Sequence, residues 1–77
     1  MFPNPFQQSA TFKVESDQVY EALDLQVFNA TGQLVQQYQE HSTDRLQMQR
    51  RNLPTGIYFY RLSGDQQLLS TGKVVIK

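Results

Sequence analysis

The sequence predicts an all-β fold, a small antiparallel β-sandwich of six or seven strands. Apolar and polar side chains alternate with the period of two that a strand imposes, and turn residues recur about every 8–12 residues. No stretch shows the apolar spacing of an amphipathic helix. With 77 residues, the chain is expected to form a single domain over residues 1–77, because domains typically contain about 100–150 residues. For a domain this small we expect a stability on the order of 5 kcal/mol.

The expected strands are separated by segments rich in Gly, Pro, Asn, Asp and Ser, which favour turns. A hairpin turn is expected at residues 29–32, where Gly32 permits a positive φ, and a polar loop at residues 41–44. In chain order, the expected strands cover residues 10–15, 23–27, 34–38, 45–49, 57–62 and 67–76. Alternation along these strands predicts a core that contains Phe12, Val14, Leu25, Val27, Leu46, Met48, Tyr58, Tyr60 and Leu62.

Two glycines are expected to shape the last two strands. Gly56 follows Pro54 and Thr55 and directly precedes an aromatic strand. We therefore expect Gly56 to adopt a positive φ or to lie where a Cβ would clash. Gly72 interrupts the last strand and is expected to mark a β-bulge.

The strand expected at residues 57–62 is apolar on both faces. Tyr58 and Tyr60 occupy one face, whereas Ile57 and Phe59 occupy the other. Because a two-layer sandwich has a wet outer face, this excess of apolar residues allows two interpretations. In one, the outer face meets a partner. In the other, the tyrosines lie outside with their hydroxyls in water.

The composition excludes several classes of function. Seven basic and seven acidic residues give a formal net charge of zero, so no overall charge attracts the chain to nucleic acid or to an anionic membrane. The adjacent pair Arg50 and Arg51 is expected at a solvated strand end.

The absence of cysteine excludes disulfides, zinc–thiolate sites and thiol catalysis. No apolar run reaches the about 18 residues of a membrane span, and residues 1–6 lack the features of a signal peptide. Export would thus require another part of a longer precursor.

Few residues suggest chemistry. His41, the single histidine, is expected in a solvated loop, and nothing in the sequence orients its ring toward Ser42 or Thr43 as a catalytic base. The carboxylates lack the spacing of a calcium loop, and the glycines do not form a phosphate loop. Residues 29–31 match an N-glycosylation sequon, although Asn and Thr are also ordinary turn residues. We expect no catalytic residue, no metal site and no cofactor.

Four segments of the chain form a pattern known from one family. They are Phe2-Pro3-Asn4-Pro5-Phe6, residues 27–35, residues 53–62 and residues 72–77. The first is similar to an aromatic-P-N-P start, the second to a strand–turn–strand segment, the third to an L-x-x-G-x-Y segment and the fourth to a closing lysine–aliphatic–lysine strand. In this order and at this spacing they resemble the C-terminal sorting domain of type IX (Por) secretion substrates in the Bacteroidetes. Residues 36–50 match only as alternating strand.

The resemblance implies an immunoglobulin-like sandwich that serves as an address and not as an enzyme. Such domains follow a secreted cargo in the same precursor, which a Sec signal peptide takes to the periplasm. The outer-membrane translocon recognises the folded domain, and in most members a cysteine peptidase at the cell surface, acting as a sortase, removes it. The cargo is then released or joined to surface lipopolysaccharide. The implied partners are therefore the translocon, the peptidase and the N-terminal cargo, with neither nucleic acid nor membrane insertion; a homodimer is left open.

The family's motif positions define the candidate recognition residues. The last strand ends at the final residue, so we expect its edge to offer backbone N–H and C=O groups to a receptor strand. Lys73 and Lys77 are expected to discourage pairing with the edge of a wrong strand. The alternative function is a stand-alone immunoglobulin-like adhesion or carbohydrate-binding module, against which the absence of Trp argues. The candidate recognition residues are Pro3, Asn4, Pro5, Gly32, Gly56, Tyr58, Lys73, Val74, Val75, Ile76 and Lys77.

Overall fold

A computed structural model describes residues 9–14 and 19–77, and within these ranges the chain folds entirely into strands and turns. None of these residues belongs to a helix that would be long and apolar enough to span a membrane. The all-β prediction is confirmed. The strands are β1 (Ser9–Lys13), β2 (Tyr20–Phe28), β3 (Leu34–Thr43), β4 (Arg45–Gln49), β5 (Gly56–Gly64) and β6 (Gln67–Ile76).

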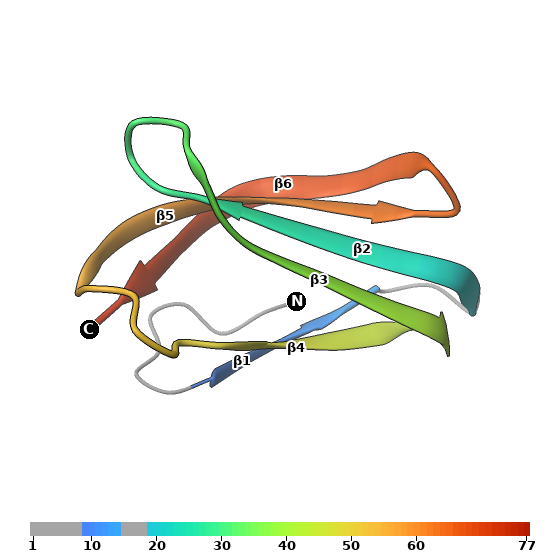
Figure 1. Cartoon of the computed structure of the whole chain (residues 1–77). Helices are drawn as coiled ribbons and strands as arrows, with labels where there is room; N and C mark the ends of the chain where they lie inside the picture. The colour runs from blue at the N-terminus through green and yellow to red at the C-terminus, as the bar shows by residue number, and fades with distance from the viewer. Residues whose placement is uncertain (1–8, 15–18) are drawn as a thin grey trace.

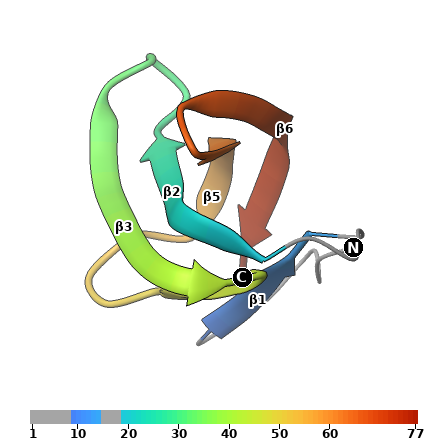
Figure 2. The ribbon, with the colours of Figure 1, turned by 90° about the vertical axis from the view of Figure 1, so that its right-hand side faces the viewer.

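The strands form two antiparallel sheets that lie face to face (Figure 1). The larger sheet has the order β3-β2-β5-β6, and the smaller pairs β1 with β4. Figure 2 shows β3 curving from the larger sheet toward the smaller one. If β2, β3, β5 and β6 are read as strands C, C′, F and G, and β1 and β4 as B and E, this is the strand order of an immunoglobulin-like sandwich. The predicted architecture is therefore confirmed.

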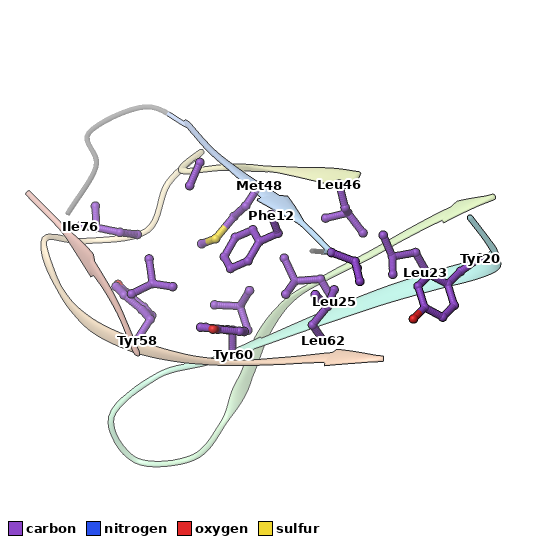
Figure 3. Close-up of a cluster of buried hydrophobic side chains, with 14 residues drawn as sticks. Phe12, Tyr20, Leu23, Leu25, Leu46, Met48, Tyr58, Tyr60, Leu62 and Ile76 are labelled. Carbon is purple, nitrogen blue, oxygen red and sulfur yellow. The ribbon is translucent and has the colours of Figure 1, made fainter. Parts of the chain in front are cut away.

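The core lies between the two sheets and is made of the inward-facing residues of five strands (Figure 3). Every core residue predicted from the alternation is buried. The structure adds further buried core residues, mainly from the start of β2 and the end of β6. They are Ala10, Tyr20, Leu23, Val74 and Ile76.

One aromatic contact joins the sheets near the middle of the core. Phe12 of β1 meets Tyr60 of β5 edge to face, with 5.0 Å between the ring centroids and an angle of 62° between the rings. Phe12 is 0% exposed and Tyr60 2%. Such aromatic pairs add about 0.5–1.5 kcal/mol to the gain from burial alone.

The exposure of the β5 side chains decides which of its two apolar faces lies outside. Tyr58 and Tyr60 are 5% and 2% exposed, whereas Ile57 and Phe59 are 49% and 45% exposed. The interpretation that places the tyrosines on the wet face is wrong. The outer face of β5 instead presents Ile57 and Phe59.

The expected polar loop at residues 41–44 is mostly strand. β3 continues to Thr43, because β2 begins at Tyr20 and supplies the pairs Tyr20–Thr43 and Ala22–His41. Backbone pairing here outweighs the polar composition that predicted a loop. His41 places its Nδ1 3.2 Å from the carbonyl oxygen of Glu21.

The expectation for Gly56 is wrong. Its φ lies outside the left-handed region, and no heavy atom lies within 4 Å of the position that a Cβ would occupy. Gly56 already belongs to β5, where it pairs with Ile76 in extended conformation. The preceding Pro54 and Thr55 complete the turn, so no special glycine geometry is required.

The bulge predicted at Gly72 lies three residues earlier. Leu62 pairs with Ser70 and Ser63 with Leu68, so that Leu69 is the extra residue of β6. The bulge allows Leu69 to pack against the core. Gly72 is a regular partner of Tyr60, and a Cβ at Gly72 would lie 2.7 Å from Cε2 of that ring. Gly72 is therefore needed to accommodate the Tyr60 ring.

Gly72→Ala is expected to destabilise the domain by about 1–3 kcal/mol, the usual cost of overpacking a core. The control is Gly56→Ala, the same chemical change in open space, which should alter stability by less than about 0.5 kcal/mol. Urea unfolding followed by circular dichroism measures both. Equal effects of the two substitutions would contradict the contact between Gly72 and Tyr60.

Candidate recognition surface at the C-terminal strand

The structure brings together the candidate residues of the last two segments. Gly56 pairs with Ile76, Tyr58 with Val74, and Lys73 with Phe59, so that the start of β5 lies along the end of β6. Gly32 lies apart, in the hairpin between β2 and β3. Three further candidates, Pro3, Asn4 and Pro5, lie outside the described residues.

Burial divides the candidate residues of this region into two groups. Val74 and Ile76 are 0% exposed and Tyr58 is 5% exposed. A partner of the folded domain does not reach these three side chains, whose role is to build the core. Lys73 and Lys77 are exposed, and Val75 is half-buried on the outer face. Alternation along β6 thus separates residues that form the fold from residues that are presented to the outside.

Tyr58 also fixes the turn that precedes β5. Its hydroxyl donates a hydrogen bond to the carbonyl oxygen of Pro54 over 2.7 Å. A tyrosine at the start of strand F that bonds back to the chain a few residues upstream is the tyrosine corner of immunoglobulin-like domains. This contact supports the strand assignment made from the sheet order.

Arg50 ties the end of β6 to the same turn, a role that the sequence did not reveal. Its Nη1 donates to the main-chain oxygen of Lys77 over 2.6 Å, its Nε to that of Leu53 over 3.1 Å, and its Nη2 to Oγ1 of Thr55 over 3.1 Å. The expectation of a solvated arginine pair is wrong for Arg50, which is half-buried. A planar guanidinium can serve several acceptors at once, which suits this clamp.

Arg51 differs from its neighbour. It is exposed, has a φ of 54°, and lies over the Tyr38 ring with 5.9 Å from Cζ to the ring centroid. The Tyr38 hydroxyl lies 2.8 Å from Oε1 of Gln36 and 3.1 Å from the carbonyl oxygen of Gln49. The side chains of Arg51 and Tyr38 line an open groove of about 380 Å³.

The hairpin at Gly32 is organised by Asn29. Its Oδ1 accepts hydrogen bonds from the backbone N–H groups of Thr31 and Gln33, over 3.1 and 2.9 Å, and from the Thr31 hydroxyl over 2.8 Å. Gly32 has a φ of 90°, which explains the glycine. The sequon residues therefore have a structural role in the turn.

The residues that the structure describes form no obvious metal-binding site. No group of three or more His, Cys, Asp or Glu side chains is placed there to hold a metal ion.

The sheet order and the tyrosine corner define a small immunoglobulin-like sandwich whose closing strand presents alternate side chains to the outside. Across residues 1–77 the chain matches the family model of the secretion system C-terminal sorting domain. No curated protein matches it. The chain thus belongs to the type IX secretion C-terminal sorting domain family. Members are secretion signals of Bacteroidetes, generally without enzymatic activity, that direct export to the cell surface or out of the cell.

Arg50→Ala is expected to lower stability by about 1–2 kcal/mol, since hydrogen bonds from a charged donor are lost from a half-buried site. Arg50→Lys should recover only part of the loss, because an ammonium does not reproduce the guanidinium fork. Arg61→Ala, on the exposed face of β5, is the control, with an expected change below about 0.5 kcal/mol. Chemical unfolding provides the measurement, and an unchanged stability of Arg50→Ala would rule out the clamp.

Proposed function

We propose that this domain is the C-terminal export signal of a larger cargo protein and that residues 1–77 form a single domain at the end of that precursor. The precursor crosses the inner membrane by a Sec signal peptide, folds in the periplasm, and leaves through the outer-membrane translocon of the type IX system. A surface cysteine peptidase then removes the domain. In this proposal the domain is a ligand and a substrate, needs no cofactor and does not insert into the membrane.

The observation that carries the proposal is the division of the closing strand. The family's motif residues at the end of β6 alternate between the core and the surface: Val74 and Ile76 are fully buried, while Lys73 and Lys77 are exposed. Only the folded domain presents the outer residues in the fixed spacing of β6 with the inner ones withdrawn, and we propose that the receptor reads this arrangement. Folding in the periplasm then becomes a condition for recognition.

The alternative of a carbohydrate-binding module has weaker support. Sugar-binding sandwiches use exposed aromatic platforms, and the groove near Tyr38 is the nearest match. Arg51 lies over the Tyr38 ring, however, and the Tyr38 hydroxyl is held by hydrogen bonds within the domain. This arrangement leaves little of the ring for stacking on a sugar.

A fusion tests the proposed function. A Sec signal peptide and a fluorescent cargo placed ahead of the 77 residues should be exported by a Bacteroidetes cell with an intact type IX system and retained by a mutant that lacks the translocon. Removing residues 73–77 deletes two buried core side chains, so the truncated fusion should stay in the periplasm. The ratio of extracellular to periplasmic fluorescence is measured. Export of the truncated fusion at the full rate, or export without the translocon, would contradict the proposal.

A further inference from the structure

The described acidic side chains of this electrically neutral chain are confined to one half of the sandwich. We call the end at which β2 and β6 finish and β3 and β5 begin the terminal end; the 29–33 hairpin, the turn before β5 and residue 77 lie there (Figure 1). The registers place Lys73 beside Phe59 at this end and Asp24 beside Ser63 toward the other. The cations on the terminal half are Arg50, Arg51, Arg61, Lys73 and Lys77. The described Asp and Glu side chains, all on the opposite half, are Glu21, Asp24, Glu40, Asp44 and Asp65. Two cations, Lys13 and Arg45, share that half with them.

The outer face of the larger sheet is divided in the same way. Phe28 pairs with Leu34 on β3 and with Phe59 on β5, and Ile57 pairs with Val75 on β6, so these side chains adjoin one another across all four strands. We call Phe28, Leu34, Ile57, Phe59 and Val75 the outer apolar patch. Leu34 and Ile57 are each 49% exposed and Phe59 45%.

The next rows of the same face are mostly polar. Arg61 pairs with Gln26 and Thr71, and Asp24 pairs with Ser63, whose partner on β6 is the exposed Leu68. The Asp24 carboxylate accepts a hydrogen bond from Nε2 of Gln37 over 3.2 Å. On β2 and β5 the alternation that puts polar residues outside thus holds for one half of the sheet and stops at Phe28 and Phe59. Contiguous exposed apolar residues on a small domain typically mark an interaction site.

We propose that the outer apolar patch and its cations dock onto a protein of the export machinery whose surface presents apolar side chains surrounded by carboxylates. The proposal rests on the proposed function and names the face of the domain that is read. Charge complementarity selects the partner: the described side chains of the terminal half include five cations and no Asp or Glu, and opposite charges around an apolar centre steer association and fix its orientation.

Charge also disfavours a second copy of this chain as the occupant. Two patches packed against each other around a two-fold axis would bring the same set of residues together from both copies. Lys73 lies in the row of Phe59 and Arg61 in the row beyond it, so such a dimer would place like charges against each other, which is unfavourable.

The test uses the cargo fusion with two kinds of substitution and a matched control for each. Ile57→Thr with Phe59→Thr removes apolar surface but keeps strand-forming residues; its control is Val19→Thr with Leu68→Thr, two residues at the opposite end that are 63% and 57% exposed. Lys73→Glu reverses a charge at the patch, and Lys13→Glu, on β1, reverses one away from it. Circular dichroism and thermal unfolding of each 77-residue chain show whether it is folded.

The two patch variants are expected to fold and to lower the extracellular-to-periplasmic ratio by about ten-fold, which corresponds to roughly 1.4 kcal/mol of binding free energy. Both controls should export as the unaltered fusion does. Normal export of a folded patch variant, while the unaltered fusion still depends on the translocon, would overturn the proposal and leave the proposed function standing. Export of the unaltered fusion without the translocon would instead overturn the function itself. If the patch double variant is unfolded, Lys73→Glu decides alone.

Two measurements on the 77-residue chain exclude the other occupants. Co-sedimentation with vesicles of phosphatidylethanolamine and phosphatidylglycerol, lost in Ile57→Thr with Phe59→Thr, would overturn the proposal in favour of a lipid surface. A dimer in sedimentation velocity that the same variant abolishes would overturn it in favour of a second copy. A monomer that does not sediment with vesicles is the result we expect.

Discussion

The contact between Phe12 and Tyr60 joins the two sheets within the buried core, and the closing strand β6 packs against the same tyrosine. Phe12 belongs to the two-stranded sheet, and Tyr60 to the centre of the four-stranded one. The Tyr60 ring also lies against Gly72 of β6, and its hydroxyl is 3.3 Å from Oγ of Ser70. A single tyrosine therefore connects the smaller sheet, β5 and the closing strand.

This arrangement makes the closing strand part of the fold and not an appended tag. Val74 and Ile76 complete the core next to Tyr58, and Arg50 holds the strand's end through the main-chain oxygen of Lys77. The outer residues of the same strand are then fixed in position relative to the outer face of β5. A partner that binds there meets a rigid surface, which reduces the entropy lost on binding.

Alternation in the sequence was enough to predict the six strands and the inward-facing residues, because period-two burial is a local property. Features that depend on distant partners could not be predicted in this way. The strand at His41 forms because Ala22 lies opposite it, and the role of Arg50 depends on the oxygen of Lys77, 27 positions along the chain. Gly72 was predicted to mark a bulge, but it is needed because the Tyr60 ring of the neighbouring strand lies where its Cβ would be. The confinement of the described acidic side chains to one half likewise appears only when the register sets the rows side by side.

The most direct test of this account removes Phe12 and leaves the closing strand unchanged. Phe12→Ala should cost about 3–5 kcal/mol, which is comparable with the stability of on the order of 5 kcal/mol expected for the domain. Phe12→Leu, which keeps the site apolar, serves as the control. If the export signal is the folded sandwich, the Phe12→Ala fusion should remain in the periplasm and the Phe12→Leu fusion should be exported. Export of an unfolded Phe12→Ala fusion at the normal rate would show that the closing strand is read as a linear tag and would contradict the account.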